Sequence, residues 1–181
     1  MIIVNLYGGP GSGKSTMRAD VFRQLKQRGV NCEEVTEFAK VCVWEGRFSA
    51  LKCQPFIFAQ QLYATQMLSE SVDVVVTDSP LLLCHYYASL QGRDPESFYT
   101  YMRDAAAQFV SMDYFLTRAG QYKTDGRMQN EEEANQVGDD IQAMLDHQGV
   151  DYRELVGNDT SAGHIVHWVM QRLDADKRHQ Y

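Results

Sequence analysis

Short apolar runs alternate with amphipathic stretches along the chain, a pattern typical of alternating strands and helices. Apolar runs predict strands over residues 2–7, 31–37, 72–77, 112–117 and 150–156. Helical periodicity predicts helices over 14–28, 38–44, 55–69, 81–90, 96–110, 131–147 and 161–173, with Gly138 interrupting the helix over 131–147. Strands that alternate with helices form parallel sheets covered on both faces, so the sequence predicts an α/β fold.

The length of 181 residues fits one compact domain, and no repeat or linker divides the chain. We therefore expect a single domain over residues 1–181. An apolar fraction of 44% excludes a mainly disordered chain. No apolar run approaches the roughly 18 residues that span a bilayer, which argues against an integral membrane protein. The amino terminus is expected to be a strand rather than a secretory leader, because it lacks a basic region and a cleavage site.

Charge and cysteine content bear on the ligands and the cellular location to be expected. The chain carries 17 Lys and Arg against 24 Asp and Glu, a net charge of −7. An acidic chain is unsuited to binding nucleic acid through its overall charge, although the net charge does not exclude a local basic channel that binds it. The cysteines form no CxxC pair and no cluster, so they predict no metal site. We expect reduced thiols and a cytoplasmic location.

One segment carries a specific motif, because it fits G-x-x-x-x-G-K-[ST] completely. Glycines let successive backbone N–H groups point at phosphate oxygens, Lys14 can reach the β- and γ-phosphates, and the Ser15 hydroxyl can bind Mg²⁺. The segment follows a predicted strand and opens a predicted helix, as a phosphate-binding loop must. We therefore predict ATP and Mg²⁺ as cofactors. The nucleotide-binding residues would be Gly8, Gly9, Pro10, Gly11, Ser12, Gly13, Lys14, Ser15 and Thr16.

The phosphate-binding motif alone does not choose between a kinase, an ATPase and a GTPase. A GTPase is expected to carry the guanine-reading tetrapeptide N-K-x-D, which this sequence lacks. A kinase needs one carboxylate for the accepting hydroxyl and one for the metal. Glu37 closes the second predicted strand and Asp78 comes directly after the third, beside the phosphate loop. The alternatives are a helix N-cap for Asp78 and a solvated side chain for Glu37.

Cations that could stabilise a transferring phosphoryl group follow the fourth predicted strand. The polar segment 118–127 contains Arg118, Lys123 and Arg127 and two glycines. We interpret residues 118–130 as a lid that closes over the phosphates, with Lys14, Arg118 and Arg127 as catalytic cations. An ordinary surface loop is the alternative.

The order of these features resembles the nucleoside and nucleotide kinases of the P-loop class. The resemblance extends from the phosphate loop through Glu37, Ala59-Gln60 and Val76-Thr77-Asp78 to Asp125-Gly126-Arg127. The outline is similar to ribosylnicotinamide kinase modules and to phage P-loop kinases, including enzymes that phosphorylate hydroxymethyluracil within DNA. It implies the P-loop NTPase fold, with a five-stranded parallel sheet in the order 2-3-1-4-5. If the protein is phage-encoded, its location would be the host cytoplasm.

A second resemblance, to deoxyribonucleoside kinases, concerns the acceptor. In that family a glutamate after the second strand acts as base and precedes a tryptophan, and here Glu37 and Trp44 look similar. A glutamine on an aromatic-rich helix reads the base, and Gln60 is similar. The family's Glu-Arg-Ser motif is replaced here by 78–80, Asp-Ser-Pro. The resemblance implies that Glu37 and Gln60 bind the substrate.

Together these features predict a kinase that transfers the γ-phosphate of ATP to a hydroxyl of a nucleoside-like acceptor. Lys14, Glu37, Asp78, Arg118 and Arg127 would be catalytic, and Ser15 and Asp78 would hold the metal. Either Glu37 or Asp78 could be the base. The sequence is also compatible with a homodimer. The net charge favours a free acceptor; an acceptor within DNA would need a basic groove built from Lys40, Arg47, Lys52, Arg93 and Arg103. The alternative is a P-loop ATPase that serves as a regulatory or binding module.

Overall fold

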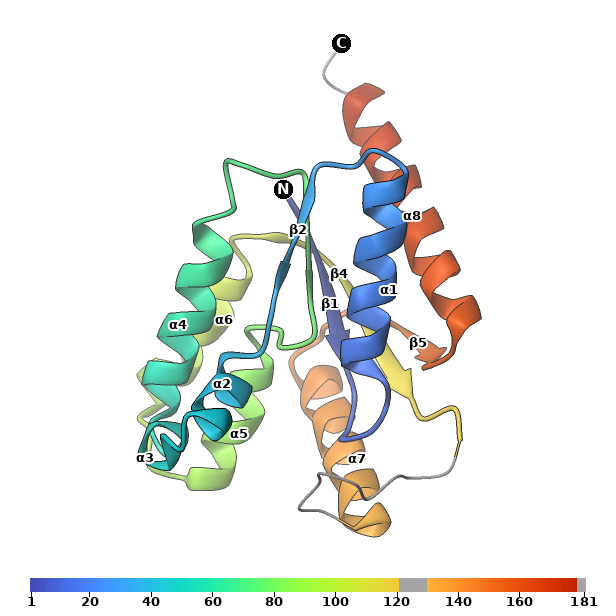
Figure 1. Ribbon diagram of the computed structural model, residues 1–181. Coiled ribbons are helices and arrows are strands. Elements are labelled where there is room, and N and C mark those ends of the chain that lie inside the picture. The colour runs from blue at the N-terminus through green and yellow to red at the C-terminus, as the bar shows by residue number, and fades with distance from the viewer. Residues whose placement is uncertain (121–129, 179–181) are drawn as a thin grey trace.

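The computed structural model describes residues 1–120 and 130–178 and contains a five-stranded, wholly parallel sheet (Figure 1). The strand order is β2-β3-β1-β4-β5, so the predicted α/β class and strand order are confirmed. The phosphate loop thus follows the central strand. The strands are β1 (Ile2–Tyr7), β2 (Cys32–Val35), β3 (Val74–Thr77), β4 (Val110–Thr117) and β5 (Tyr152–Val156).

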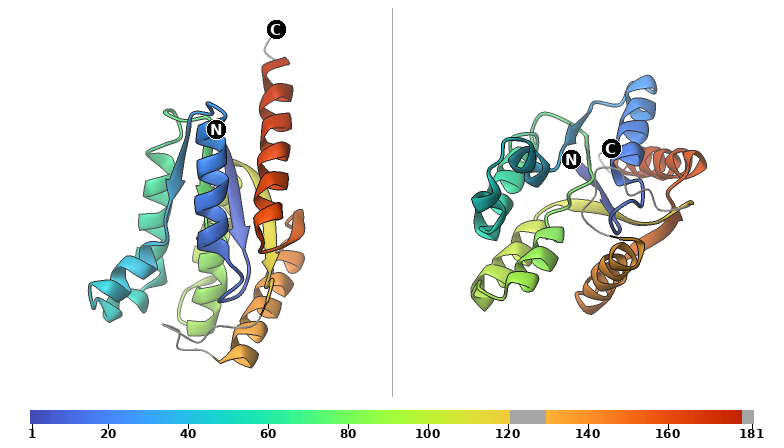
Figure 2. Two further views of the ribbon diagram at one scale, coloured as in Figure 1. Left: turned by 45° about the vertical axis from the view of Figure 1, so that its right-hand side comes forward. Right: turned by 60° about the horizontal axis from the view of Figure 1, so that its bottom comes forward.

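Helices cover both faces of the sheet (Figure 2). α1 (Lys14–Gln27) and α8 (Asp159–Arg178) pack on one face, where Val4 and Leu6 of β1 contact the apolar side of both helices. The other face carries α4 (Gln54–Gln66), α5 (Leu83–Gln91), α6 (Glu96–Ala106) and α7 (Glu131–His147). The short helices α2 (Phe38–Trp44) and α3 (Phe48–Leu51) join α4, α5 and α6 in a second apolar cluster. None of the described helices combines the length and apolarity that crossing a membrane requires.

Three expectations about element boundaries were wrong. The helix predicted over 96–110 ends at Ala106, because Val110 pairs with Ile2 and begins β4. The strand predicted over 31–37 ends at Val35, and Glu37 is instead the N-cap residue of α2. Gly138 does not interrupt α7, which runs unbroken through it. In each case a contact distant in sequence, or the start of the next element, overrides the local pattern.

Every strand is parallel to its neighbours, so all strand carboxyl ends lie at one edge of the sheet. The loop after β1 contains the phosphate-binding motif, and the segment after β3 begins with Asp78. Arg118 follows β4, and Gly157 follows β5. Ligands of open parallel sheets bind at this carboxyl edge.

Candidate functional site

The loop between β1 and α1 has a backbone that its glycines make accessible. Gly8, Gly11 and Gly13 have φ angles of 137°, 80° and 91°, in the region that L side chains rarely adopt. A Cβ at Gly8 would lie 2.5 Å from the carbonyl oxygen of Leu116. Gly13 is the N-cap of α1 and offers no side-chain hydrogen bond to the first turn. The N–H groups at the start of α1 are therefore available to an anion.

Two further glycines allow neighbouring elements to approach this loop. A Cβ at Gly157 would lie 2.1 Å from the carbonyl oxygen of Ser12, so the turn after β5 contacts the loop through backbone atoms. A Cβ at Gly9 would lie 2.6 Å from the carbonyl oxygen of Ala134 on α7, so this helix also contacts the loop through backbone atoms. The sequence pattern predicted a helix break at Gly138, but this residue lies within α7, beside Gly9. The loop is held between α7 and the β5–α8 turn.

Lys14 is folded over its own loop. Its Nζ donates hydrogen bonds to the carbonyl oxygens of Gly8 at 2.6 Å and Gly9 at 3.0 Å. These contacts place the ammonium group at the mouth of the loop, where a nucleotide's terminal phosphates would replace or join the carbonyl acceptors.

Ser15 and Asp78 come together beside the loop, although they are far apart in sequence. The Ser15 hydroxyl donates to Oδ2 of Asp78 at 2.6 Å, and the Asp78 carboxylate is only 4% exposed. Asp78 does not cap a helix, since α5 begins at Leu83 with Leu82 as its N-cap. A carboxylate and a hydroxyl side by side are the hard oxygen ligands that Mg²⁺ prefers, so these residues fit the metal that a P-loop implies.

Arg18 is a member of this cluster that sequence reasoning missed. It lies one turn after Ser15 on α1, and its guanidinium joins two carboxylates: Nε donates to Glu34 at 2.8 Å, and Nη1 donates to Asp78 at 3.0 Å. Its spacing from Ser15 was the available signal, because residues three apart share a helix face. Arg18 therefore balances the buried charge of Asp78 and fixes its orientation.

Glu37 lies in the same electrostatic environment. Burial raises the pKa of the Glu37 carboxyl, and the nearby Asp78 raises it further, while Lys14 and Lys40 act in the opposite direction. On α5, burial followed by the charge of Glu37 raises the pKa of Cys84 to about 12. Glu37 thus lies within electrostatic reach of both Lys14 and Asp78, at the end of the sheet where the phosphate loop lies.

The structure also locates Arg118, at the start of the predicted lid. Its guanidinium donates to the carbonyl oxygen of Pro10 at 3.2 Å and to the side chain of Asn135 at 2.9 Å. A weaker contact of 3.4 Å reaches Glu131. Arg118 therefore bridges the phosphate loop and α7. Arg127 and most of the predicted lid lie outside the described residues.

The glutamine pair on α4 is divided between two environments. Gln60 is half-buried and, with Gln61, lines a cavity of about 450 Å³ between β2 and α4. Gln61 is only 2% exposed, and its Oε1 accepts a 3.4 Å hydrogen bond from the backbone of Phe38, the residue after Glu37. Gln61 is thus the glutamine bonded beside Glu37. Trp44, which looked similar to a kinase tryptophan, is 80% exposed.

Comparison with known proteins gives the family. The sequence profile of the AAA domain family matches residues 3–161, which include the phosphate loop, Glu37, Asp78 and Arg118. The chain belongs to the AAA domain family. No curated protein sequence matches this AAA domain.

Solved structures add the fold. The thymidylate kinase of Ehrlichia chaffeensis is similar to this AAA domain with a TM-score of 0.59 and 14% identity, over 96% of this chain and 98% of that one. Shikimate kinase from Aquifex aeolicus gives a TM-score of 0.48 and 15% identity, over 97% and 98% of the two chains. Because the sequence identity to thymidylate kinase is only 14%, this similarity shows a shared P-loop kinase-like fold and no more.

Proposed function

We propose that this AAA domain is an ATP- and Mg²⁺-dependent kinase that transfers the γ-phosphate to a hydroxyl of a nucleoside-like acceptor. The observation that carries the proposal is the position of Glu37, a half-buried carboxylate of raised pKa within electrostatic reach of Lys14 and Asp78. A metal carboxylate is already supplied by Asp78, so a second one beside it suits proton abstraction. The likeness to thymidylate kinase in fold is consistent with this reaction.

In the proposed reaction, the backbone of the phosphate loop and Lys14 bind the β- and γ-phosphates. Ser15 and Asp78 would hold Mg²⁺, which when bound neutralises charge on the phosphate oxygens. Glu37 accepts the proton of the acceptor hydroxyl as its oxygen forms a bond to the γ-phosphorus. The bond between that phosphorus and the β–γ bridging oxygen breaks, and ADP leaves with the electron pair. Arg118, held beside Pro10, stabilises the charge that develops on the transferring group.

The raised pKa of Glu37 suits this role. A base works best when its pKa lies near the working pH, because it is then both deprotonated and able to hold the proton. Burial and the charge of Asp78 move the Glu37 pKa in that direction. Asp78 is held by Ser15 and Arg18, so both of its oxygens already accept hydrogen bonds. We therefore assign the base to Glu37 and the metal to Asp78.

The test is transfer of ³²P from the γ-position of ATP to a panel of free nucleosides, mononucleotides and hydroxymethyluracil-containing DNA. We expect a labelled product with at least one of them, lost in the Glu37→Gln variant while ATP binding persists. The control Glu33→Gln changes an exposed side chain of β2 paired with Lys26 and should leave transfer unchanged. Release of labelled inorganic phosphate at the same rate with and without every acceptor would contradict the proposal and favour the regulatory ATPase.

A further inference from the structure

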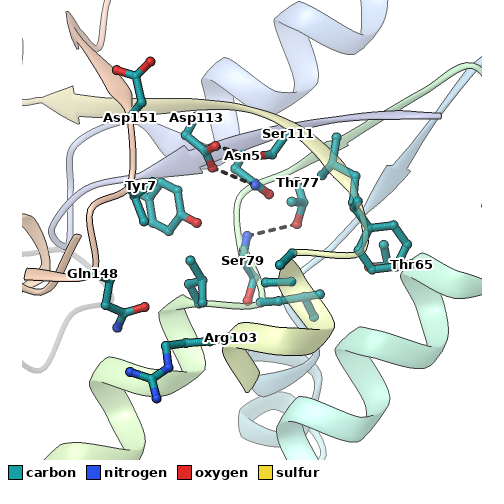
Figure 3. A pocket seen from close by; sticks show the side chains of 17 residues that line it. Asn5, Tyr7, Thr65, Thr77, Ser79, Arg103, Ser111, Asp113, Gln148 and Asp151 are labelled. Atoms are coloured by element: carbon teal, nitrogen blue, oxygen red, sulfur yellow. Dashed lines mark hydrogen bonds between the residues drawn. The ribbon is translucent and has the colours of Figure 1, made fainter. Parts of the chain in front are cut away.

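A second cavity lies under the face of the sheet opposite α1 and α8 (Figure 3). Its lining contains none of residues 8–16 of the phosphate loop but includes Thr77 and Ser79, on either side of Asp78. Its volume of about 460 Å³ is in the range of small-molecule sites. Ile3, Asn5 and Tyr7 of β1 line it, as do Ser111 and Asp113 near the start of β4. The last turn of α6 and the segment after α7 form its other walls, so it lies toward the amino end of the sheet.

The floor of this cavity is polar where a parallel sheet is normally apolar. Asn5 is paired in register with Thr77 on β3 and with Asp113 on β4, so three neighbouring strands place a polar side chain in one row. The alternate β1 residues Val4 and Leu6 face the opposite layer and are fully buried. Burying such a polar row is costly unless hydrogen bonds compensate. The row therefore suits a face that receives a polar occupant.

Hydrogen bonds hold the Asp113 carboxylate in this row. Asn5 donates its amide N–H to Oδ1 of Asp113 at 2.8 Å, and the Ser111 hydroxyl donates to Oδ2 (Figure 3). Burial raises the pKa of the Asp113 carboxyl, and hydrogen bonds from Ser111, Asn5 and Tyr7 partly offset the rise. The carboxylate keeps lone pairs that these bonds do not use, since two oxygens offer about four acceptor sites.

Gln148, at the C-cap of α7, supplies the observation that points to a ligand. Its side chain lies toward the cavity in Figure 3, and both its Oε1 and its Nε2 are shielded from solvent. Neither atom has a hydrogen-bond partner among residues 1–120 and 130–178. Turning the amide over leaves the same two atoms unpaired, so the conclusion does not depend on its orientation. A shielded amide without partners costs about 1–3 kcal/mol per group, which a ligand would recover.

We propose that this cavity binds a nucleobase, as a site separate from the phosphate loop. An unpaired donor and acceptor side by side on Gln148 match a ligand edge with an acceptor beside a donor, and nucleobases carry such edges. The Asp113 carboxylate accepts from amino or hydroxyl groups of the same ligand, and the apolar walls at Leu82, Ala106 and Val150 contact its faces. Arg103 on the rim would face an attached polar group.

The test is saturation-transfer NMR with uridine, cytidine, adenosine and guanosine, each added to protein whose phosphate loop is filled with MgADP. We expect at least one nucleoside to bind, with an affinity at least tenfold lower for the Gln148→Leu variant. Asp113→Asn should lower the affinity for the same nucleoside several-fold. The control Gln136→Leu removes an exposed glutamine of the same helix and should leave binding unchanged. Thermal melts report whether each variant is folded.

Two results would overturn this inference: no nucleoside binds at millimolar concentration, or binding is the same in wild type and Gln148→Leu. The inference does not rest on the proposed kinase reaction, and the two fail separately. Nucleoside binding that Gln148→Leu abolishes but Glu37→Gln does not would support the cavity even if no phosphate is transferred. Phosphate transfer with binding insensitive to Gln148 would leave the reaction standing and remove the cavity site.

Discussion

Replacing Arg18 with methionine tests the cluster that joins α1, β2 and β3. Methionine keeps the aliphatic length but removes the guanidinium that bonds Asp78 at 3.0 Å and Glu34 at 2.8 Å. Within the described part of the chain, the Asp78 carboxylate, only 4% exposed, would then keep its hydrogen bond from Ser15 alone. We expect Arg18→Met to destabilise the protein.

The magnitude follows from the burial of each partner. A hydrogen bond to a charged group contributes about 1.5–3 kcal/mol, which applies to the bond with buried Asp78. The Glu34 side chain is 25% exposed, so its pair with Arg18 is partly screened and contributes about 0–1 kcal/mol. The free energy of unfolding should therefore fall by about 1.5–4 kcal/mol, a large share of the ~5–15 kcal/mol typical of a domain. The melting temperature should fall by roughly 3–16 °C.

Urea unfolding of wild type, Arg18→Met, Asp78→Asn and the double variant measures this coupling. Asparagine is neutral and can still accept from Ser15, so removing the arginine in that background should cost only about 0–1 kcal/mol. Arg23→Met is the matched control, because Arg23 lies on the same helix with a 57% exposed side chain paired to Asp20. The reasoning is refuted if Arg18→Met costs no more than Arg23→Met, or if the Asp78→Asn background leaves its cost unchanged.

Three further predictions concern the phosphate loop and its base. Lys14→Ala should abolish phosphate transfer while leaving the far-ultraviolet circular dichroism spectrum unchanged; retained turnover would contradict its role. Burial raises the pKa of Glu37 above its ordinary value of 4.5, so the ionised form destabilises the fold as pH rises from 4.5 through that raised pKa. Glu37→Gln should therefore melt above wild type at neutral pH and converge with it below pH 4.5, while transfer falls by about 10²–10⁴-fold. Gly138→Ala should stabilise α7 by up to ~1 kcal/mol in urea unfolding, because its Cβ meets Gly9 at an ordinary 3.7 Å. Gly9→Ala should destabilise the protein, since its Cβ would lie 2.6 Å from the carbonyl oxygen of Ala134. Equal changes in the free energy of unfolding for Gly138→Ala and Gly9→Ala would refute this geometry.

The fold class was accessible from sequence because its determinants are local. Each buried strand is a run of apolar residues, and each helix has its own periodicity. The phosphate loop is nine consecutive residues, and its glycines, Lys14 and Ser15 act through the backbone of that same segment. Placing Asp78 after the most apolar strand was enough to bring it to the same edge of the sheet, since parallel strands end together.

Element boundaries and partners depended on residues far away in the chain. Val110 is a strand residue because Ile2 pairs with it, and Gly138 lies within an unbroken α7 whose backbone packs against Gly9 of the phosphate loop. The partner of Arg18 could not be read from α1, since Asp78 lies 60 residues further on. Between the adjacent glutamines on α4, only packing against α2 made Gln61 the one bonded beside Glu37.

An α/β sheet with a phosphate-binding loop after its first strand follows from the amino-acid sequence, because such signals lie within one stretch of backbone. The tertiary structure alone decided which charges meet around Asp78 and how far Glu37 is buried. It also decided that Asn5, Thr77 and Asp113 form one polar row that lines the same cavity as Gln148. Those properties arise from strand register and helix placement, which depend on the whole set of packing contacts rather than on any single segment.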